Sequence, residues 1–225
     1  MKRLVIATLI IVLATPVFAA DAPKTEEQKT LYAIGLLVAR SLGVFHLAPA
    51  ELEFVKQGIN DAVAGKNPEV DLKVYGAKVQ DLARERRKAL GEKAAASGKE
   101  FLDKVAKEKG AVKTDSGMVY FSLKEGAGVS PKPTDTVKVN YRGALPDGKE
   151  FDSSYKRGTP TEFRLDGVIK CWTEGVQKMK PGGKARLVCP SSLAYGDAGA
   201  GEMILPGATL DFEVELLEVK KAVAK

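Results

Sequence analysis

The sequence predicts an α+β protein in two parts: a helical first half, then an antiparallel half-open sheet around one short helix. Two observations support this prediction. Between Asp21 and about Gly110 apolar residues recur at helical spacing, and from Val119 onward they alternate with polar ones. The chain has 225 residues, 44% hydrophobic and 28% charged, which is typical of a folded protein of one or two domains.

Residues 1–19 have the pattern of a secretory signal. Lys2 and Arg3 precede an apolar run that ends at Ala14, and small residues around Ala19 offer a cleavage site. An uncleaved membrane anchor is the alternative, but the run is shorter than the roughly 20 residues that span a bilayer. We therefore expect cleavage after about Ala19, a periplasmic location and no stable membrane anchor.

Residues 20–112 are expected to form a helical dimerisation or chaperone domain. Thr25 and Gln28 make a capping box that opens a first helix. Pro49 is placed to open a second helix, which Gly65 ends.

A third helix is predicted over about 71–107. Its apolar residues near the start repeat at heptad-like spacing: Leu72, Tyr75, Val79 and Leu82. Beyond Arg86 the apolar positions become sparse, so the middle has little to bury. We expect a solvated stalk of about 54 Å, at 1.5 Å per residue. The alternative is a break at Gly91 or Ser97–Gly98 into two ordinary helices.

The apolar faces of these helices exceed what a stalk can cover. A homodimer would cover them if the first two helices and the Leu72–Leu82 seam paired across a twofold axis. A self-contained monomeric bundle is the alternative.

Composition argues against several classes of function. One histidine and two cysteines are too few for a conventional zinc site, and His46 is the only histidine that a serine nucleophile could use. The formal charge of +6 falls to +4 without Lys2 and Arg3, and it is spread evenly over both halves. We expect no metal, no cofactor and no nucleic-acid partner.

The second half, 113–225, is expected to be the sheet domain. Val137, Val139 and Tyr141 alternate with polar residues, as do the apolar residues from Leu210 to Leu216. Turns are predicted at Pro146–Gly148 and Pro181–Gly183, and one short helix over Cys171–Lys178. The concave face of such a sheet is where a ligand would bind.

Five blocks of this half carry a resemblance. They are Val139–Gly143, Gly148–Ser154, Val168–Gly175, Met179–Ala185 and Leu193–Gly196, followed by Ala208–Phe212. In order and spacing, over a core of about 135–219, they resemble the FKBP family of peptidyl-prolyl cis-trans isomerases. With the helical half and the export signal, the whole chain is similar to the Mip/FkpA type of that family.

The resemblance implies the site residues. It assigns catalysis to Tyr141, Phe151, Asp152 and Tyr195. It assigns substrate binding to Val168, Ile169, Trp172, Phe163, Met203, Ile204, Phe212 and Arg157. Trp172 would form the floor under a proline ring, while the Ile169 N–H and the Tyr195 hydroxyl would bind the substrate. Met203 and Ile204 would form a lid, and Arg157 would support Asp152 or remain a solvated surface arginine.

The same residues make chemical sense on their own. Rotation about an Xaa-Pro bond faces a barrier of about 18–20 kcal/mol because twisting destroys amide resonance. A dry apolar pocket that accepts the twisted form lowers this barrier without a nucleophile or a base. Taken singly, each aromatic residue could equally be an ordinary core residue.

The resemblance also bears on the two cysteines and on partners. In such a fold Cys171 and Cys189 should lie close together, and an exported protein permits a disulfide between them; two buried free thiols are the alternative. The implied partners are partly folded exported proteins with Xaa-Pro bonds, and macrolide inhibitors. A competing hypothesis is a non-enzymatic chaperone that only binds proline segments.

Overall fold

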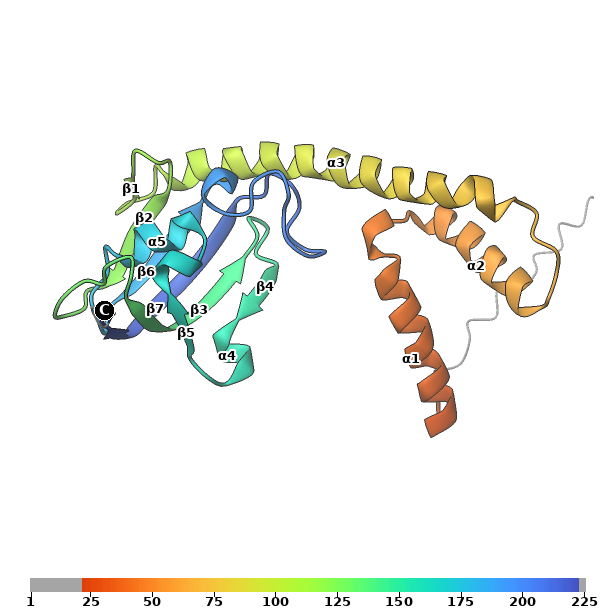
Figure 1. Cartoon of the computed structure of the whole chain (residues 1–225), viewed down its shortest axis with the longest axis horizontal. Coiled ribbons are helices and arrows are strands. Elements are labelled where there is room, and N and C mark those ends of the chain that lie inside the picture. The colour runs from red at the N-terminus through yellow and green to blue at the C-terminus, as the bar shows by residue number, and fades with distance from the viewer. Residues whose placement is uncertain (1–21, 223–225) are drawn as a thin grey trace, which may run out of the picture. The chain divides into compact units, whose positions relative to one another are not determined.

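The computed structural model of the chain describes residues 22–222 (Figure 1). The predicted signal segment, residues 1–19, lies outside the described residues. The chain divides into two compact units, with the boundary after Ser41. Within the described residues, no helix has both the length and the apolar character needed to cross a membrane.

The first unit contains helix α1, Glu26–Ser41. The predicted capping box is confirmed, because the Gln28 N–H donates to Thr25 Oγ1 at 3.1 Å and the Thr25 N–H donates to Gln28 Oε1 at 3.2 Å. No residue of α1 is buried within the single chain. Its apolar residues are therefore available for contacts outside this helix.

The second unit begins with a 3-10 turn, Gly43–Phe45, and helix α2, Pro49–Val63. Pro49 opens α2 as predicted, and Gly65 follows the helix in the left-handed region at φ +67°. The unit continues with α3, Leu72–Val105. The Arg86 guanidinium of α3 donates to Glu51 Oε1 at 2.5 Å and to the Phe45 carbonyl at 2.7 Å.

Helix α3 confirms the predicted long helix: it is continuous over 34 residues, so the alternative break at Gly91 or Gly98 is wrong. Most residues of its middle are exposed, as expected of a solvated stalk, but one narrow face is covered, because Gly91 and Gly98 are buried. The contacts there are made by backbone and small side chains, which is why counting apolar residues did not reveal them.

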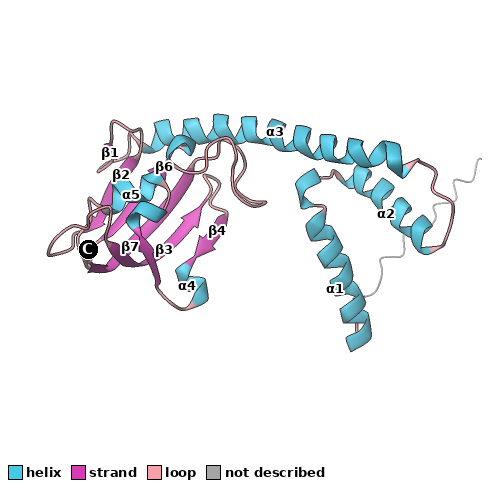
Figure 2. Cartoon of the chain, viewed as in Figure 1, coloured by secondary structure: helices cyan, strands magenta, loops and turns pink. Residues whose placement is uncertain are grey.

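The rest of the unit is a seven-stranded antiparallel sheet in the described part of the chain (Figure 2). Its strands are β1 Val112–Lys113, β2 Val119–Lys124, β3 Thr136–Ala144, β4 Glu150–Ser153, β5 Thr161–Arg164, β6 Lys184–Cys189 and β7 Leu210–Lys220. The order is β1-β2-β6-β7-β3-β4, with β5 also paired to β3. Pro146–Gly148 turns β3 back into β4, as predicted.

One face of this sheet holds the main core. The short helices of this part are α4 Ser154–Arg157, α5 Lys170–Val176 and the 3-10 turns Leu165–Gly167 and Ser191–Leu193. Helix α5 buries Cys171, Trp172 and Val176 against the sheet. Gly175 permits close packing, because a Cβ there would lie 2.7 Å from Leu187 Cδ2.

The other face is covered by the end of α3. Val119, Phe121 and Val188 point away from the main core and pack with Val105, a separate small cluster. Arg186 of β6 borders this cluster and pairs with Glu108 at 3.1 Å and with Asp211 at 2.8 Å. The last turns of α3 thus belong structurally to the sheet domain.

Candidate functional site

A pocket of about 320 Å³ opens on the α5 side of the sheet. It is lined by Tyr141, Phe151, Asp152, Phe163, Gly167, Val168, Ile169, Trp172, Tyr195 and Phe212. Nine of these ten residues were predicted site residues, and Gly167 was not. They come from β3, β4, β5, β7, α5 and two loops, so residues far apart in the sequence share one cavity.

Trp172 lies at the centre of the aromatic walls. Its ring packs edge-on against Tyr141, Phe212 and Phe163, with centroid distances of 5.1, 5.4 and 5.6 Å. Such edge-to-face contacts fix ring orientation as well as burying area. Trp172 is 4% exposed, and its indole N–H is buried without a hydrogen-bond partner in the described structure.

Gly143 makes room for the walls, a role that sequence reasoning missed. It pairs with Asp152 of β4 on one side and with Phe212 of β7 on the other. A Cβ at this position would lie 2.7 Å from the Phe151 ring and 2.8 Å from the Phe212 ring. Any side chain here would therefore displace two pocket aromatics.

Asp152 is held by a polar network at the pocket rim. Its carboxylate accepts short hydrogen bonds from the Tyr141 hydroxyl and from Arg157, and Arg157 also donates to the Tyr141 hydroxyl at 2.8 Å. Arg157 is therefore engaged with the site and is not a free surface arginine. It does not line the cavity itself.

This network shifts two pKa values in opposite directions. Burial is the largest influence on Asp152 and would raise its pKa, but the hydrogen bonds from Tyr141 and Arg157 and the Arg157 charge together lower it. Burial, with the hydrogen bond to Asp152, raises the pKa of the Tyr141 phenol. At neutral pH the pair is thus a carboxylate accepting from a neutral phenol.

Two hydrogen-bond donors of pocket-lining residues have no partner among the described residues and are not themselves buried side-chain atoms. One is the backbone N–H of Ile169, the residue before α5. The other is the hydroxyl of Tyr195, which is 41% exposed in the loop before β7. Both are available to carbonyl groups of a ligand.

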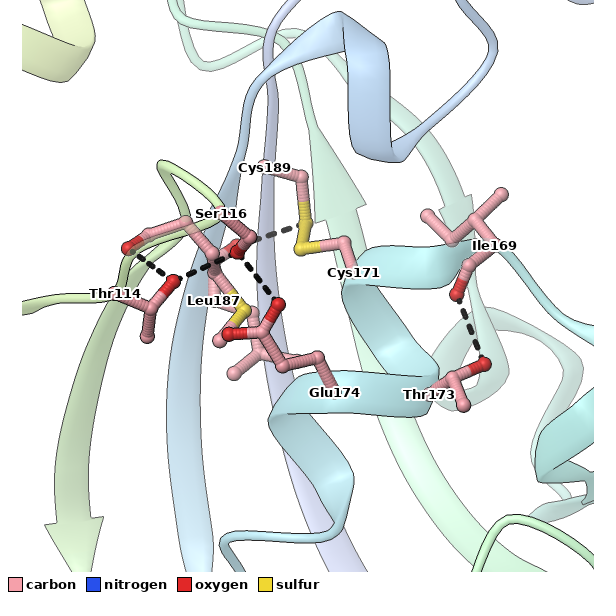
Figure 3. Close-up of a disulfide and its surroundings, with 9 residues drawn as sticks. Thr114, Ser116, Ile169, Cys171, Thr173, Glu174, Leu187 and Cys189 are labelled. Carbon is pink, nitrogen blue, oxygen red and sulfur yellow. Dashed lines mark hydrogen bonds between the residues drawn. A yellow bond between two sulfur atoms is a disulfide. The ribbon is translucent and has the colours of Figure 1, made fainter.

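A disulfide joins helix α5, which carries Trp172, to strand β6 (Figure 3). Cys171 at the start of α5 is bonded to Cys189 at the end of β6, with a Cα–Cα distance of 5.8 Å, and both residues are 0% exposed. Glu174, one turn further along α5, accepts a 2.5 Å hydrogen bond from Ser116 before β2. The helix that carries Trp172 is therefore tied to the strands at two points.

Met203 and Ile204 do not lie in this pocket. Ile204 is buried in the main core, and Met203 lines a separate hollow beside α3 with Leu145 and Leu205. Their loop folds back on itself through the Ala200–Ile204 bridge. The lid that we expected from them is absent from the described structure.

Within the described residues, no group of three or more His, Cys, Asp or Glu side chains is placed to hold a metal ion.

Comparison with known proteins agrees with this geometry. The profile of FKBP-type peptidyl-prolyl cis-trans isomerases matches residues 128–217, and that of the domain amino terminal to them matches residues 27–121. FkpA of Escherichia coli K12 is 42% identical over 93% of this chain and 83% of its own. Mip of Coxiella burnetii is 35% identical over 98% of this chain and 100% of its own.

A solved structure gives the same result. The crystal structure of FkpA from E. coli has a TM-score of 0.68 at 42% identity and covers 90% of this chain and 100% of its own. At 90% of this chain, the match extends over both the helical part and the sheet domain. The chain belongs to the family of FKBP-type peptidyl-prolyl cis-trans isomerases.

Proposed function

We propose that this isomerase rotates Xaa-Pro bonds in exported, partly folded proteins, and that it works in the periplasm as a homodimer with chaperone activity. The observation that carries the catalytic part is the pocket itself. It is a small cavity walled by aromatic rings, with two free donors and one fixed carboxylate at its rim.

The pocket can lower the barrier to rotation about the Xaa-Pro bond by excluding water. Water stabilises the planar, polar amide, so transfer of the bond into an apolar cavity favours the twisted form relative to the planar one. The barrier in water is about 18–20 kcal/mol, whereas the two end states differ by only about 0.5–1 kcal/mol. No covalent bond forms or breaks, and the reaction requires no cofactor.

The rim residues then take distinct roles. The proline ring rests on Trp172, the Ile169 N–H donates to one substrate carbonyl and the Tyr195 hydroxyl donates to another. Asp152, fixed by Tyr141 and Arg157, faces the carbon of the reacting amide. These contacts hold the chain on both sides of the bond while it rotates.

The cis/trans exchange rate of a short Xaa-Pro peptide tests this proposal. The mature protein should accelerate exchange, and a double variant, Asp152→Ala with Tyr195→Phe, should lose most of the acceleration. Tyr155→Phe is the matched control, because Tyr155 is exposed and lies outside the pocket lining. A folded wild-type protein that gives no acceleration would favour the competing hypothesis of a pocket that only binds proline segments.

The homodimer is supported by apolar surface that one chain leaves uncovered. Leu31, Ile34 and Leu37 of α1 are exposed, and so is the α3 seam of Leu72, Tyr75, Val79 and Leu82. Pairing of these faces would bury them and join two catalytic pockets. One client chain held at two sites gains effective concentration at the second.

Chaperone activity is tested with a proline-free client. The double variant with the impaired pocket should still suppress aggregation of that client, because the helical surfaces are untouched. Loss of suppression together with catalysis would assign both effects to the pocket.

The periplasmic location is supported by the signal-like residues 1–19 and by the buried disulfide, which oxidising compartments permit. The mass of the protein isolated from a periplasmic extract should match a chain cleaved after about Ala19. Macrolide inhibitors are proposed to occupy the same pocket, so they should compete with the peptide.

A further inference from the structure

The loop 195–209, called here the Tyr195 loop, carries a pocket residue at one end. It is closed on itself, because the Gly207 N–H donates to the Gly196 carbonyl at 2.9 Å. The Ala200 N–H and the Ile204 carbonyl are joined at 2.8 Å. Any displacement of Gly207 is thus passed through one hydrogen bond to the residue next to Tyr195.

Helix α3 contacts this loop along one face. Figure 1 shows the ribbon before β7 next to the helix. Arg87, Gly91, Ala95 and Gly98 are spaced by four, four and three residues, so they form one stripe. Arg87 donates to the Gly201 carbonyl at 3.2 Å and the Ala198 carbonyl at 3.3 Å. The part of the loop from Ala198 to Gly201 is therefore held by a side chain of the helix.

The glycines of this stripe are in closer contact still. A Cβ on Gly91 would lie 2.8 Å from Pro206 Cβ and 3.0 Å from the Pro206 carbonyl oxygen. A Cβ on Gly98 would lie 2.5 Å from Thr209 Oγ1. From the loop side, a Cβ on Gly207 would lie 2.8 Å from the Cβ of Ala95.

A third glycine in the same helix shows that these contacts are specific. Gly76 has nothing within 4 Å of the position of its missing Cβ. Glycine is less favourable than alanine inside a helix. At positions 91 and 98 that cost is offset by close approach of the loop, and at position 76 the single chain offers no such reason.

We propose that α3 is part of the isomerase machinery, and that Arg87, Gly91 and Gly98 are positioning residues that act on the substrate through Tyr195. The close contacts of Gly91 and Gly98 with the loop fix the position of Gly207. The Gly207–Gly196 hydrogen bond then fixes the position of Gly196 and, with it, of the neighbouring Tyr195. The proposal rests on the isomerase activity proposed above and extends it to a helix outside the pocket.

The experiment compares Gly91→Ala with Gly76→Ala in the full mature protein. The readout is kcat/KM for an Xaa-Pro peptide, measured with Tyr195 present and in a Tyr195→Phe background. We expect Gly91→Ala to lower kcat/KM at least fivefold when Tyr195 is present and less than twofold in the Tyr195→Phe background. Gly76→Ala should stay within twofold of its parent in both backgrounds.

Two results would overturn the proposal. One is a Gly91→Ala protein as active as Gly76→Ala. The other is an equal loss with and without the Tyr195 hydroxyl, because general damage to the fold would not depend on that group. An inactive wild type would instead refute the isomerase function itself, so the two failures are distinguishable.

A second variant keeps the proposal testable if Gly91→Ala does not fold. Arg87→Met removes two hydrogen bonds to the loop without adding bulk at the contact. Its control is Lys93→Met, because Lys93 is exposed on the same helix and does not line the hollow between α3 and the loop. Arg87→Met should lower kcat/KM at least twofold more than Lys93→Met, again only when Tyr195 is present, and equal rates for the two variants would refute the proposal.

Discussion

Leu187 and Leu37 are the same residue type in two different situations. Leu187 in β6 is 0% exposed and packs in the main core, whereas Leu37 in α1 is 62% exposed in the single chain. The same contrast separates the sheet domain from α1, α2 and the first half of α3. The sheet domain closes its own core within one chain, while the helices keep apolar faces that require another surface.

The difference in burial between the sheet domain and the helices suits two different tasks. Catalysis needs fixed aromatic rings, which a self-contained core supplies. Binding of many unfolded clients, and pairing of two protomers, need apolar surface that remains accessible until the partner arrives. We propose that one chain meets both needs by assigning them to separate regions.

The largest effect is expected from the seam of α3. Burial of Leu72 and Leu82 in both protomers would contribute about 1.5–3 kcal/mol per side chain. Leu72→Glu with Leu82→Glu should therefore convert the protein to a monomer in sedimentation velocity, while Gln80→Glu on the same helix should leave a dimer. A double variant that stays dimeric would remove the seam from the interface.

A leucine-to-alanine pair measures the contrast in stability. Leu187→Ala should lower the free energy of unfolding of the sheet domain by about 2–5 kcal/mol, because a buried cavity is created. Leu37→Ala should change the same urea transition by no more than about 0.5 kcal/mol. Equal losses for the two variants would contradict the division between the regions.

The disulfide should contribute to the sheet domain alone. With a sequence separation of 18 residues, the Cys171–Cys189 bond is worth about 3 kcal/mol in the loop-entropy description. Cys171→Ala with Cys189→Ala should lower the urea midpoint of that domain and leave the sedimentation of the dimer unchanged. A dimer that dissociates in this variant would link the two regions.

The smallest effect concerns pH. Because the folded pKa of Asp152 is lowered, its pairing stabilises the fold above the unfolded pKa of about 3.9 and loses this contribution as pH falls through the folded value. Both partners are half-exposed, so the gain should stay below about 1 kcal/mol. Because the lowered pKa keeps Asp152 ionised, activity should be flat from pH 8 to about pH 5.

Arg157→Ala tests the origin of that shift. Removal of the guanidinium takes away one hydrogen bond and one positive charge, so the pKa of Asp152 should rise and the acid limb of the activity profile should move to higher pH. Lys156→Ala is the control, since Lys156 pairs with Glu150 instead. An unmoved acid limb would mean that Asp152 does not control activity.

Local patterns predicted most of this fold. The capping box at Thr25, the proline start of α2 and the alternation in β3 and β7 each depend on neighbours in sequence, and each is confirmed. The aromatic residues of the pocket were found because the family resemblance fixes them in an ordered set.

What sequence could not predict are contacts between distant segments. Gly91 and Gly98 suggested a break because the sequence does not show Pro206 and Thr209 beside them. Gly143 ends the block Val139–Gly143 of the family resemblance, but no local pattern shows that it leaves space for two rings. The resemblance assigned Met203 and Ile204 to a lid, and the sequence does not show that tertiary contacts place Met203 beside α3 and Ile204 in the core.

The central claim is that catalysis belongs to the sheet domain together with the second half of α3 that packs on it, and assembly to α1, α2 and the first half of α3. The most direct measurement assays the Leu72→Glu and Leu82→Glu double variant on two substrates. Exchange of a short Xaa-Pro peptide should remain within twofold of wild type, whereas proline-limited refolding of an unfolded protein should slow at least tenfold. A parallel loss of both activities would contradict the claim.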